Sequence, residues 1–585
     1  MTTGIHNTVL GAQAGDALTS GARNVAIGYL ALSGEDDHGR NVAIGYSALS
    51  VQNAGAEAYN VAIGHAAGLS VSTGIYNNLI GSNAGSSLTT GTRNIAIGYN
   101  AMQAEDTGSH NVAIGHEALN TLDAGADAYN VAIGSSAGYS VTTGINNVLI
   151  GGLAGDNLST GNYNIAIGKS ALTTEDAHGR NVAIGHNALF YLNAGADAYN
   201  IAIGYEAGVN VTTGVENVLI GGLAGDALTT GNNNVAIGKN ALGDETTGGS
   251  NVAIGKHAMS SSQLSQHNVA IGEAALQNVT QGSLKNTYNI GIGYQAGNDI
   301  TTGEKNVLIG GIAGDALTTG ENNVAIGYNA LTTETTGTGN IAIGTNALED
   351  FNYNGNGYSV VIGNQAAKQL TGRYCTVIGS EALNAEVAGV SNVAIGFQSL
   401  KVSNGGVSNT AVGTQAGLAV STGDSNVMVG GNAGDALTTG SNNIIIGNDS
   451  AASAVDVSNE ITLGDANISA FRCADQSIAA LSDGRDKSDI EESPYGLEFI
   501  NKLKPVKFTW DFRPEHMAET KQGKSRVGFI AQDLQEAMPN NDNDILDLVY
   551  EISEDRIEAK YGNLIPVMAK AIQELSAEVK KLKNK

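Results

Sequence analysis

A serine and a lysine near the C-terminal fifth of the chain form its most reactive pairing. Ser482 and Lys487 lie in the polar stretch Leu481-Ser-Asp-Gly-Arg-Asp-Lys-Ser-Asp-Ile490, which is typical of an exposed turn. A serine hydroxyl is a weak nucleophile until a neighbouring base takes its proton. A lysine can act as that base only when burial or nearby cations lower its pKa. The same residues also fit a solvated turn in which the basic side chains pair with the neighbouring aspartates.

This stretch coincides with a break in composition along the 585 residues. Of the 79 glycines, 74 precede it, whereas all five prolines and the single tryptophan follow it. Such a break predicts a domain boundary. We therefore divide the chain into a repeat shaft (1–470), a linker to the candidate site (471–481) and a C-terminal domain (482–585).

Charge and composition narrow the functions that are open to the protein. The net charge of -27 disfavours binding to nucleic acid, because phosphate backbones would be repelled. No apolar run approaches the length of about 20 residues that spans a bilayer, and the N-terminus does not resemble a signal peptide. Cys375 and Cys473 form neither a disulfide framework nor a metal motif, and the ten histidines show no ligand spacing. We therefore expect no metal, no cofactor and no membrane insertion.

The shaft consists of one short repeat, Asn-Val-Ala-Ile-Gly, as in Asn24–Gly28 and Asn111–Gly115. With its variants it occurs 27 times, mostly 17 residues apart, and each copy is followed by Ala-Leu or Ala-Gly and a glycine-bearing turn. Each unit is too small to fold alone, so stacking must create the core. The pattern predicts an all-β fold, a parallel β-solenoid of the β-roll type.

The repeat also suggests which side chains face inward. In Val-Ala-Ile the outer two side chains share one face and the alanine points the other way. We expect valine and isoleucine, with the leucine of Ala-Leu, to fill the interior, and the alanines to form a smooth outer face for another chain. We expect the repeat asparagines to stack on their counterparts above and below.

Two sets of tyrosines are candidates for contact with a partner. The longer coils share an enlarged loop that ends in tyrosine, and we expect these loops to project from one side of the shaft as receptor-binding elements or as simple spacers: Tyr59, Tyr129, Tyr199, Tyr288 and Tyr358. A second column of tyrosine and histidine follows the repeat glycines. That column could contact glycan, although stacking for packing is the interpretation we favour.

The Asn-Val-Ala-Ile-Gly units resemble the heads of trimeric autotransporter adhesins, which are left-handed parallel β-rolls assembled as trimers. The period of 17 residues exceeds that of this family. Thr2-Thr3-Gly4 aligns with Thr142-Thr143-Gly144, so we expect the chain to start within a coil, and either a further N-terminal domain or another protein to cover that end.

The C-terminal domain reads as a small α+β unit. We expect helices over 495–503 and 532–538, strands over 505–510, 527–531 and 548–552, and a last helix over 564–583. Its Ile565, Met568, Ile572, Leu575, Val579 and Leu582 fall at alternating spacings of three and four residues, which is typical of a coiled coil.

Several motifs, in order, are similar to those of the intramolecular chaperone autoprotease of phage endosialidases and tail fibres: Leu481–Ile490, Leu503–Trp510, Gly528–Gln532 and the terminal helix. The resemblance implies a trimeric chaperone that aligns three chains and then cuts itself off. It makes Ser482 the nucleophile and Lys487 its base, with the cleavage site at Leu481, Ser482 and Asp483.

Together the two resemblances imply a bacteriophage tail fibre, made in the host cytoplasm and carried on the virion. Its partners would be two further copies of the chain, a host cell-surface receptor (a glycan or an outer-surface protein) and other tail proteins at the N-terminal end. A bacterial surface adhesin is one alternative. A tailspike enzyme that acts on host glycan is another, but it would need paired carboxylates, and no singular Asp/Glu constellation interrupts the repeats.

Overall fold

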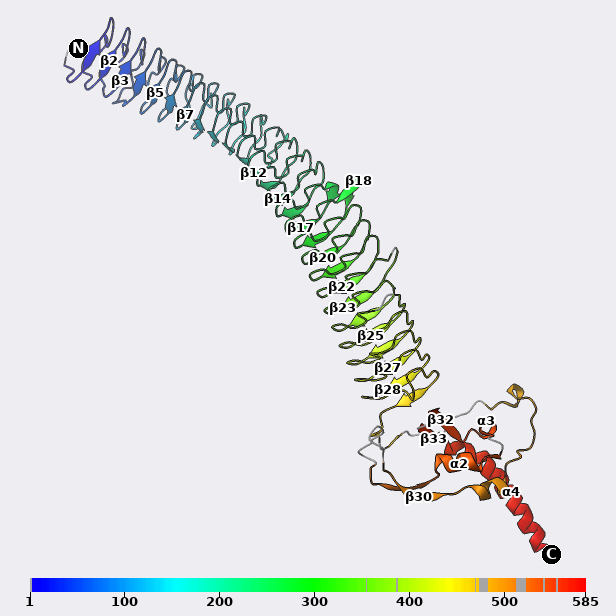
Figure 1. The fold of residues 1–585 in the computed structure, drawn as a ribbon. Helices are drawn as coiled ribbons and strands as arrows, with labels where there is room; N and C mark the ends of the chain where they lie inside the picture. Colours follow the sequence, from blue (N-terminus) through cyan, green and yellow to red (C-terminus); the bar gives the residue numbers. More distant parts are fainter. Residues whose placement is uncertain are drawn as a thin grey trace. The chain divides into compact units, whose positions relative to one another are not determined.

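The computed structural model describes residues 3–353, 355–385, 388–468, 470–472, 482–511, 522–539, 542–553 and 556–585. The chain divides into two compact units, Met1–Glu381 and Ala382–Lys585. The first consists of stacked coils, and the second holds further coils and the α+β module (Figure 1). Three-residue strands, one for each coil, form a single 27-stranded sheet.

The strands share the pattern of the repeat, with a glycine directly after each one. In the first unit they are β1 (Thr8–Leu10), β2 (Val25–Ile27), β3 (Val42–Ile44), β4 (Val61–Ile63), β5 (Asn78–Ile80), β6 (Ile95–Ile97), β7 (Val112–Ile114), β8 (Val131–Ile133), β9 (Val148–Ile150), β10 (Ile165–Ile167), β11 (Val182–Ile184), β12 (Ile201–Ile203), β13 (Val218–Ile220), β14 (Val235–Ile237), β15 (Val252–Ile254), β17 (Val269–Ile271), β19 (Ile290–Ile292), β20 (Val307–Ile309), β21 (Val324–Ile326), β22 (Ile341–Ile343), β23 (Val360–Ile362) and β24 (Thr376–Ile378). In the second unit they are β25 (Val393–Ile395), β26 (Thr410–Val412), β27 (Val427–Val429), β28 (Ile444–Ile446) and β29 (Ile461–Leu463).

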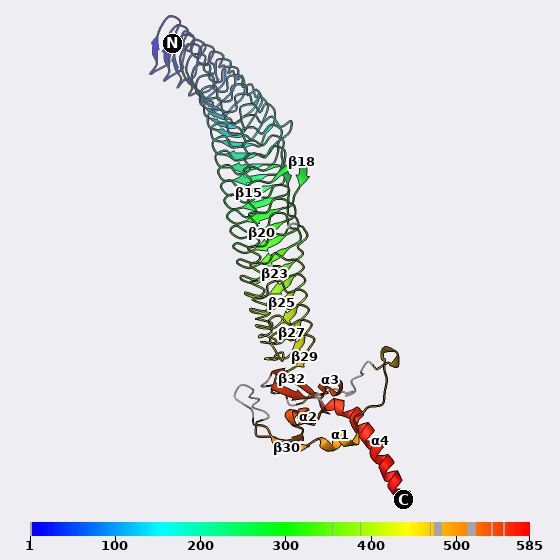
Figure 2. The ribbon, with the colours of Figure 1, turned by 45° about the vertical axis from the view of Figure 1, so that its right-hand side comes forward.

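Neighbouring strands pair in parallel and in phase with the repeat. Val25 lies beside Val42 and Ala26 beside Ala43, and the same register continues from coil to coil. The predicted parallel β-solenoid is therefore confirmed. A second parallel pair, β16 (Gln263–Gln266) and β18 (Thr280–Asn286), lies outside the main sheet, and Figure 2 shows β18 beside the stack.

Buried asparagines run along the solenoid as a hydrogen-bonded column. The Oδ1 atom of Asn217 accepts the backbone N–H of Asn234 at 3.0 Å, and its Nδ2 atom donates to the carbonyl of Gly231 at 2.9 Å. The same two bonds recur at most other coils, for example at Asn60, Asn77 and Asn306. The predicted asparagine stack is confirmed, and it satisfies backbone groups that the coil corner would otherwise leave without partners.

The predicted direction of the strand side chains is wrong. The central residue of each strand is inside: Ala26, Ala96 and Ala166 have no accessible surface. Valine and isoleucine on either side are only partly buried and face outward. The leucine of Ala-Leu does lie inside, as expected.

The narrow interior explains this arrangement. Where the central strand residue is Leu79, the following corner carries Gly85, and a Cβ atom there would lie 2.8 Å from Leu79 Cδ2. Where the central residue is alanine, leucine commonly occupies the corner instead, as at Leu32. The limited space at this level of each coil favours alanine in the strand where leucine fills the corner, although valine with leucine also fits, as at Val377 and Leu383.

The C-terminal module holds a small α+β core. Its elements are the 3-10 turns η1 (Gly484–Asp486) and η4 (Tyr561–Asn563), the helices α1 (Leu497–Lys502), α2 (Ala531–Ala537), α3 (Asn543–Leu546) and α4 (Leu564–Lys583), and the antiparallel pairs β30 (Val506–Thr509) with β31 (Ser525–Gly528) and β32 (Val549–Ser553) with β33 (Arg556–Ala559). Buried side chains that include Phe499, Leu534, Leu548 and Val567 form the core. None of the helices in the described part of the chain has the length and apolar character that crossing a membrane requires.

The module agrees with the sequence in its main elements, and β33 and α3 were not foreseen. The first strand of the last hairpin was predicted at 548–552 and lies at Val549–Ser553, while α4 has the predicted bounds. The domain boundaries at 470 and 481 stay predictions, because residues 473–481 lie outside the described part of the chain.

Asn217→Ala should destabilise the solenoid by about 2 kcal/mol or more, because it leaves the buried N–H of Asn234 and the carbonyl of Gly231 without partners. Asn193→Ala is the matched control, since that side chain is exposed and should change stability by less than about 0.5 kcal/mol. Thermal unfolding followed by circular dichroism measures both variants. Equal midpoints for the two would contradict the structural role of the asparagine column.

Candidate functional site

Ser482 and Lys487 are joined by a direct hydrogen bond. The Nζ atom of Lys487 donates to the Oγ atom of Ser482 at 2.7 Å. The short turn η1 lies between them, and Asp483 caps its start by accepting the backbone N–H of Arg485 at 2.9 Å. The backbone N–H of Lys487 closes the turn on the carbonyl of Gly484 at 3.4 Å, which directs the lysine back toward the serine.

Arg485 and Asp483 pair with each other, and Lys487 bonds to Ser482. The guanidinium of Arg485 binds both oxygens of Asp483, which lowers the pKa of that carboxyl group and raises the pKa of Arg485. The solvated-turn interpretation therefore fits Arg485, whereas Lys487 makes the contact that nucleophilic chemistry requires.

Both members of the pair are exposed in the single chain. An ammonium group that donates to a serine must first lose a proton before it can accept one from the hydroxyl, and water stabilises its charged form. The single chain therefore has the hydrogen bond between the two side chains, but water can still reach the lysine. The third residue of the predicted cleavage site, Leu481, lies outside the described residues.

Comparison with known families agrees with this location. Residues 482–543 match the Peptidase S74 family, described as the chaperone of endosialidase. Over these residues the C-terminal module is therefore similar to a chaperone domain. The matched segment starts at Ser482 and contains α1, β30, β31 and α2. No curated protein matches the chain.

The five candidate receptor-binding tyrosines belong to a coil corner. Tyr59, Tyr129 and Tyr199 each directly precede a buried asparagine of the column and have positive φ angles of 52°, 52° and 51°. All five side chains are about half exposed: Tyr59, Tyr129, Tyr199, Tyr288 and Tyr358. They therefore line one edge of the coils, and the exposed residues of the enlarged loops, such as Gly55, lie before them in each coil.

These tyrosines stack on rings in adjacent coils. Tyr59 lies 5.4 Å from Tyr76, and Tyr129 lies 4.8 Å from His110, measured between ring centroids. Arg180 donates to the hydroxyl of Tyr199 at 2.9 Å. A partner would therefore meet ring edges, hydroxyl groups and guanidinium groups more than open ring faces.

The column that follows the repeat glycines is stacked in the same way. Tyr29, Tyr46 and His65 succeed one another at centroid distances of 5.4 and 5.1 Å. The stacking that the packing interpretation predicts is present in these coils, and glycan contact stays a hypothesis. Stacked rings stabilise adjacent coils against each other and leave few free faces for a sugar.

Sequence reasoning missed a recurring buried glutamate. Five coils place one at the same turn, and all five have no accessible surface: Glu35, Glu105, Glu175, Glu245 and Glu334. Burial raises the pKa of Glu35, Glu105 and Glu175. Two similar sequences at equivalent places in two coils could have revealed these glutamates: Glu-Asp-Asp-His at 35–38 and Glu-Asp-Ala-His at 175–178.

Ser482→Ala should leave the chain uncut, because removal of Oγ removes the predicted nucleophile; Lys487→Ala should do the same by removing its base. Ser488→Ala is the matched control, since it changes a neighbouring exposed serine and should allow normal cutting. Intact mass and a denaturing gel of freshly expressed protein report the result. Cutting of Ser482→Ala at the usual place would disprove the assignment of the nucleophile.

Proposed function

We propose that the protein is a trimeric bacteriophage tail fibre whose solenoid contacts the host surface and whose C-terminal chaperone aligns three chains before cutting itself off. The observation that carries this proposal is the bond between Ser482 Oγ and Lys487 Nζ at the start of the matched chaperone segment. A chaperone joined to a long solenoid suits a fibre that must assemble in register.

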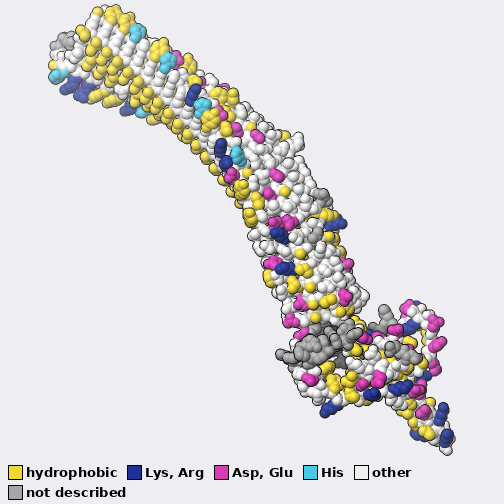
Figure 3. Space-filling view, in the orientation of Figure 1, with side chains coloured by type: hydrophobic (Ala, Val, Ile, Leu, Met, Phe, Trp, Pro, Cys, Tyr) yellow, Lys and Arg dark blue, Asp and Glu magenta, His cyan; other side chains and the backbone are white. Residues whose placement is uncertain are grey.

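The outer face of the sheet supports a trimer. Valine and isoleucine leave the strands on the side away from the core, and Ile133, Ile203 and Ile271 are 37%, 36% and 37% exposed. Figure 3 shows rows of hydrophobic side chains along the coils of the first unit. A soluble protein rarely leaves so long an apolar surface uncovered. We assign the chain-to-chain contact to this face, in place of the alanine face expected from the sequence.

Helix α4 carries a second uncovered apolar surface. Leu564, Val567 and Ala571 are buried. The predicted coiled-coil positions are instead exposed: Ile565, Met568, Ile572, Leu575, Val579 and Leu582. Three such helices could bury these side chains against one another.

The cutting reaction depends on assembly. The hydroxyl of Ser482 adds to the carbonyl carbon of a neighbouring peptide bond while the neutral amine of Lys487 takes its proton. The peptide C–N bond then breaks and the departing amine takes the proton back from Lys487, which leaves an ester on Ser482 Oγ. Water hydrolyses this ester, giving a free carboxyl group and restoring the serine hydroxyl. Because both side chains are exposed in one chain, we propose that the packing of three modules removes water from the lysine and starts the reaction.

Replacing Ile133, Ile203 and Ile271 by serine should weaken the trimer, because each change removes about 1 kcal/mol or more of apolar burial per chain. Leu69→Ser with Leu153→Ser is the matched control, since these side chains are similarly exposed (37% and 40%) but lie outside the strands. Multi-angle light scattering of the purified proteins measures the mass. A stable, folded monomer of the unmodified chain would overturn the trimer.

Replacing Tyr59, Tyr129 and Tyr199 by alanine should slow adsorption of the phage to host cells by about tenfold or more, because tyrosines of this kind commonly dominate contact energies. The matched control replaces Tyr29, Tyr99 and Tyr205, which are equally exposed in the other column. Adsorption rates and trimer melting temperatures are measured together. Equal adsorption by the two triple variants would place the receptor contact elsewhere.

A further inference from the structure

The five buried glutamates occur in two sequence forms that differ at one position. Three turns read Glu-x-x-Gly, at Glu105, Glu245 and Glu334, and two read Glu-x-x-His, at Glu35 and Glu175. The backbone follows the same path in both forms. The carbonyl of the fourth residue accepts an asparagine Nδ2 atom in each, from Asn94 at Gly108 and from Asn24 at His38.

In the glycine form the carboxylate is well satisfied by backbone donors. Glu245 Oε1 accepts the N–H groups of Gly248 at 2.7 Å and Leu264 at 2.9 Å, and its Oε2 atom accepts the N–H of Ser265 at 3.1 Å. Glu334 repeats this pattern through Gly337 and Tyr353. These carboxylates need no further partner.

The fourth position has no room for a side chain while the carboxylate stays there. A Cβ atom on Gly108 would lie 2.6 Å from Glu105 Cδ, and one on Gly337 would lie 2.4 Å from a Glu334 oxygen. Histidine at this position therefore requires the carboxylate to move. The hydrogen bond from the backbone N–H of the fourth residue to the carboxylate is 3.0 Å long at both Glu35 and Glu175, compared with 2.7 Å at Glu245.

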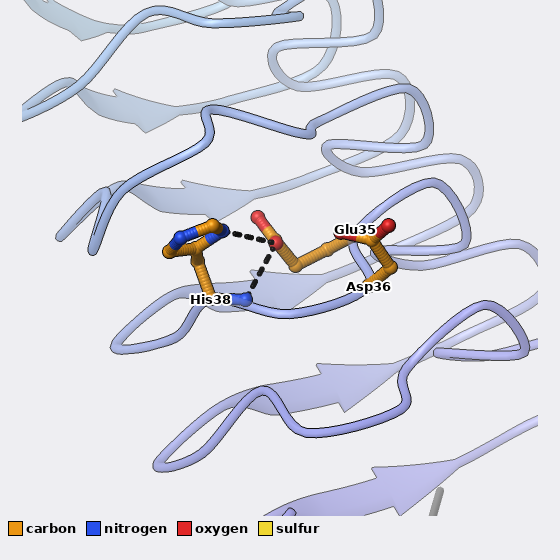
Figure 4. Close-up of side chains that lie close together, drawn as sticks. All are labelled: Glu35, Asp36 and His38. Carbon is orange, nitrogen blue, oxygen red and sulfur yellow. Dashed lines mark hydrogen bonds and ion pairs between the residues drawn. The ribbon is translucent and has the colours of Figure 1, made fainter.

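The displaced carboxylates keep one buried oxygen without a partner. Oε2 of Glu35 and of Glu175 are inaccessible and make no hydrogen bond of good geometry, and the same holds for the Nδ1 atoms of His38 and His178. The backbone of Ala194 and the ring of His178 lie near enough to Glu175 to lower its pKa, against the larger effect of burial, so Glu35 is the less satisfied of the two. The carboxylate of Glu35 points to the ring of His38 (Figure 4), with 3.9 Å between Oε1 and Nδ1. The corresponding distance from Glu175 to His178 is 3.3 Å.

An aspartate completes each group. One carboxylate oxygen of Asp36 lies within 4.8 Å of the ligand atoms of Glu35 and His38, and Asp176 does the same in the other turn. Ligands bound to a zinc ion at about 2.0–2.2 Å lie roughly 3–4 Å apart, so a closure of about 1 Å brings the three atoms into one coordination shell. Asp36 and His38 are partly exposed, which leaves a path for the ion.

We propose that Glu35, Asp36 and His38, and equally Glu175, Asp176 and His178, each bind one divalent transition-metal ion of the zinc class. One imidazole and two carboxylates suit zinc, cobalt or manganese better than calcium, which takes oxygen ligands. The ion satisfies the two buried atoms that the exchange of glycine for histidine leaves without partners, and water fills its remaining positions. The all-oxygen cluster of Glu105, Asp106 and Asp123 is different, because Glu105 is already bonded to Gly108 and Ala124.

The test is equilibrium dialysis of the full-length, tag-free protein against Zn²⁺, with the bound metal counted by mass spectrometry. We expect two ions per chain for the unmodified protein, one for His38→Gly and none for His38→Gly with His178→Gly. Glycine restores the arrangement of the satisfied turns, so the double variant should be at least as stable as the unmodified protein without metal. His65→Gln is the control and should keep two ions.

Two further measurements distinguish these sites from nonspecific binding of metal to the protein surface. Zn²⁺ should raise the melting temperature of the unmodified protein and leave that of the double glycine variant unchanged. Co²⁺ should give visible absorption bands with the unmodified protein that the double variant lacks. Equal zinc uptake by the two proteins, or no uptake by either at tens of micromolar zinc, would overturn the proposal, whatever the outcome for the fibre function.

Discussion

The hydrogen bonds that pass from one buried asparagine to the next are the interaction on which the solenoid depends. Each asparagine holds the backbone of the following coil through Oδ1 and a more distant carbonyl through Nδ2. A slip of one residue would turn the buried face of each strand outward, and the asparagine bonds add a directional link to particular backbone groups of the next coil. The column therefore determines where every corner, tyrosine and buried glutamate lies.

Three features of the single chain are exposed to water where contact with another chain would cover them. The sheet exposes its valine and isoleucine face, α4 exposes its coiled-coil positions, and the Ser482–Lys487 pair lies open to water. Each would gain from close contact with identical chains. Under the proposed function these features share one requirement, since the pair would react once the apolar surfaces are covered.

Sequence periodicity predicted the solenoid, the asparagine column and the terminal helix, whereas the roles of Ser482 and Lys487 came from the family resemblance. It could not assign the faces of Val-Ala-Ile, because alternation defines two faces without saying which is inside. Only the volume around Leu79 and Gly85 decides that question. The general rule that large apolar residues lie inside fails here, since the interior is narrow and the outer face is itself apolar.

The functional details were harder to predict than the fold. Tyr59 and its equivalents looked like loop residues because they end the enlarged segments, but each directly precedes a buried polar residue, an asparagine except at Ser359, and so lies at a corner. The Glu-x-x-His turns were hidden because a histidine within a repeat looks like ordinary variation. Their meaning appears only beside the glycine turns, where the missing space around the carboxylate can be measured.

The asparagine column also means that the length of the solenoid is set by a whole number of coils in register. Each coil bonds only to its neighbours, and equivalent glycines such as Gly81, Gly151 and Gly221 recur after four coils. Loss or duplication of a segment such as 81–150 would therefore rejoin coils of matching register, with the same corners aligned. The length of the solenoid could change in whole coils during evolution, while its corners and the repeat register stayed the same.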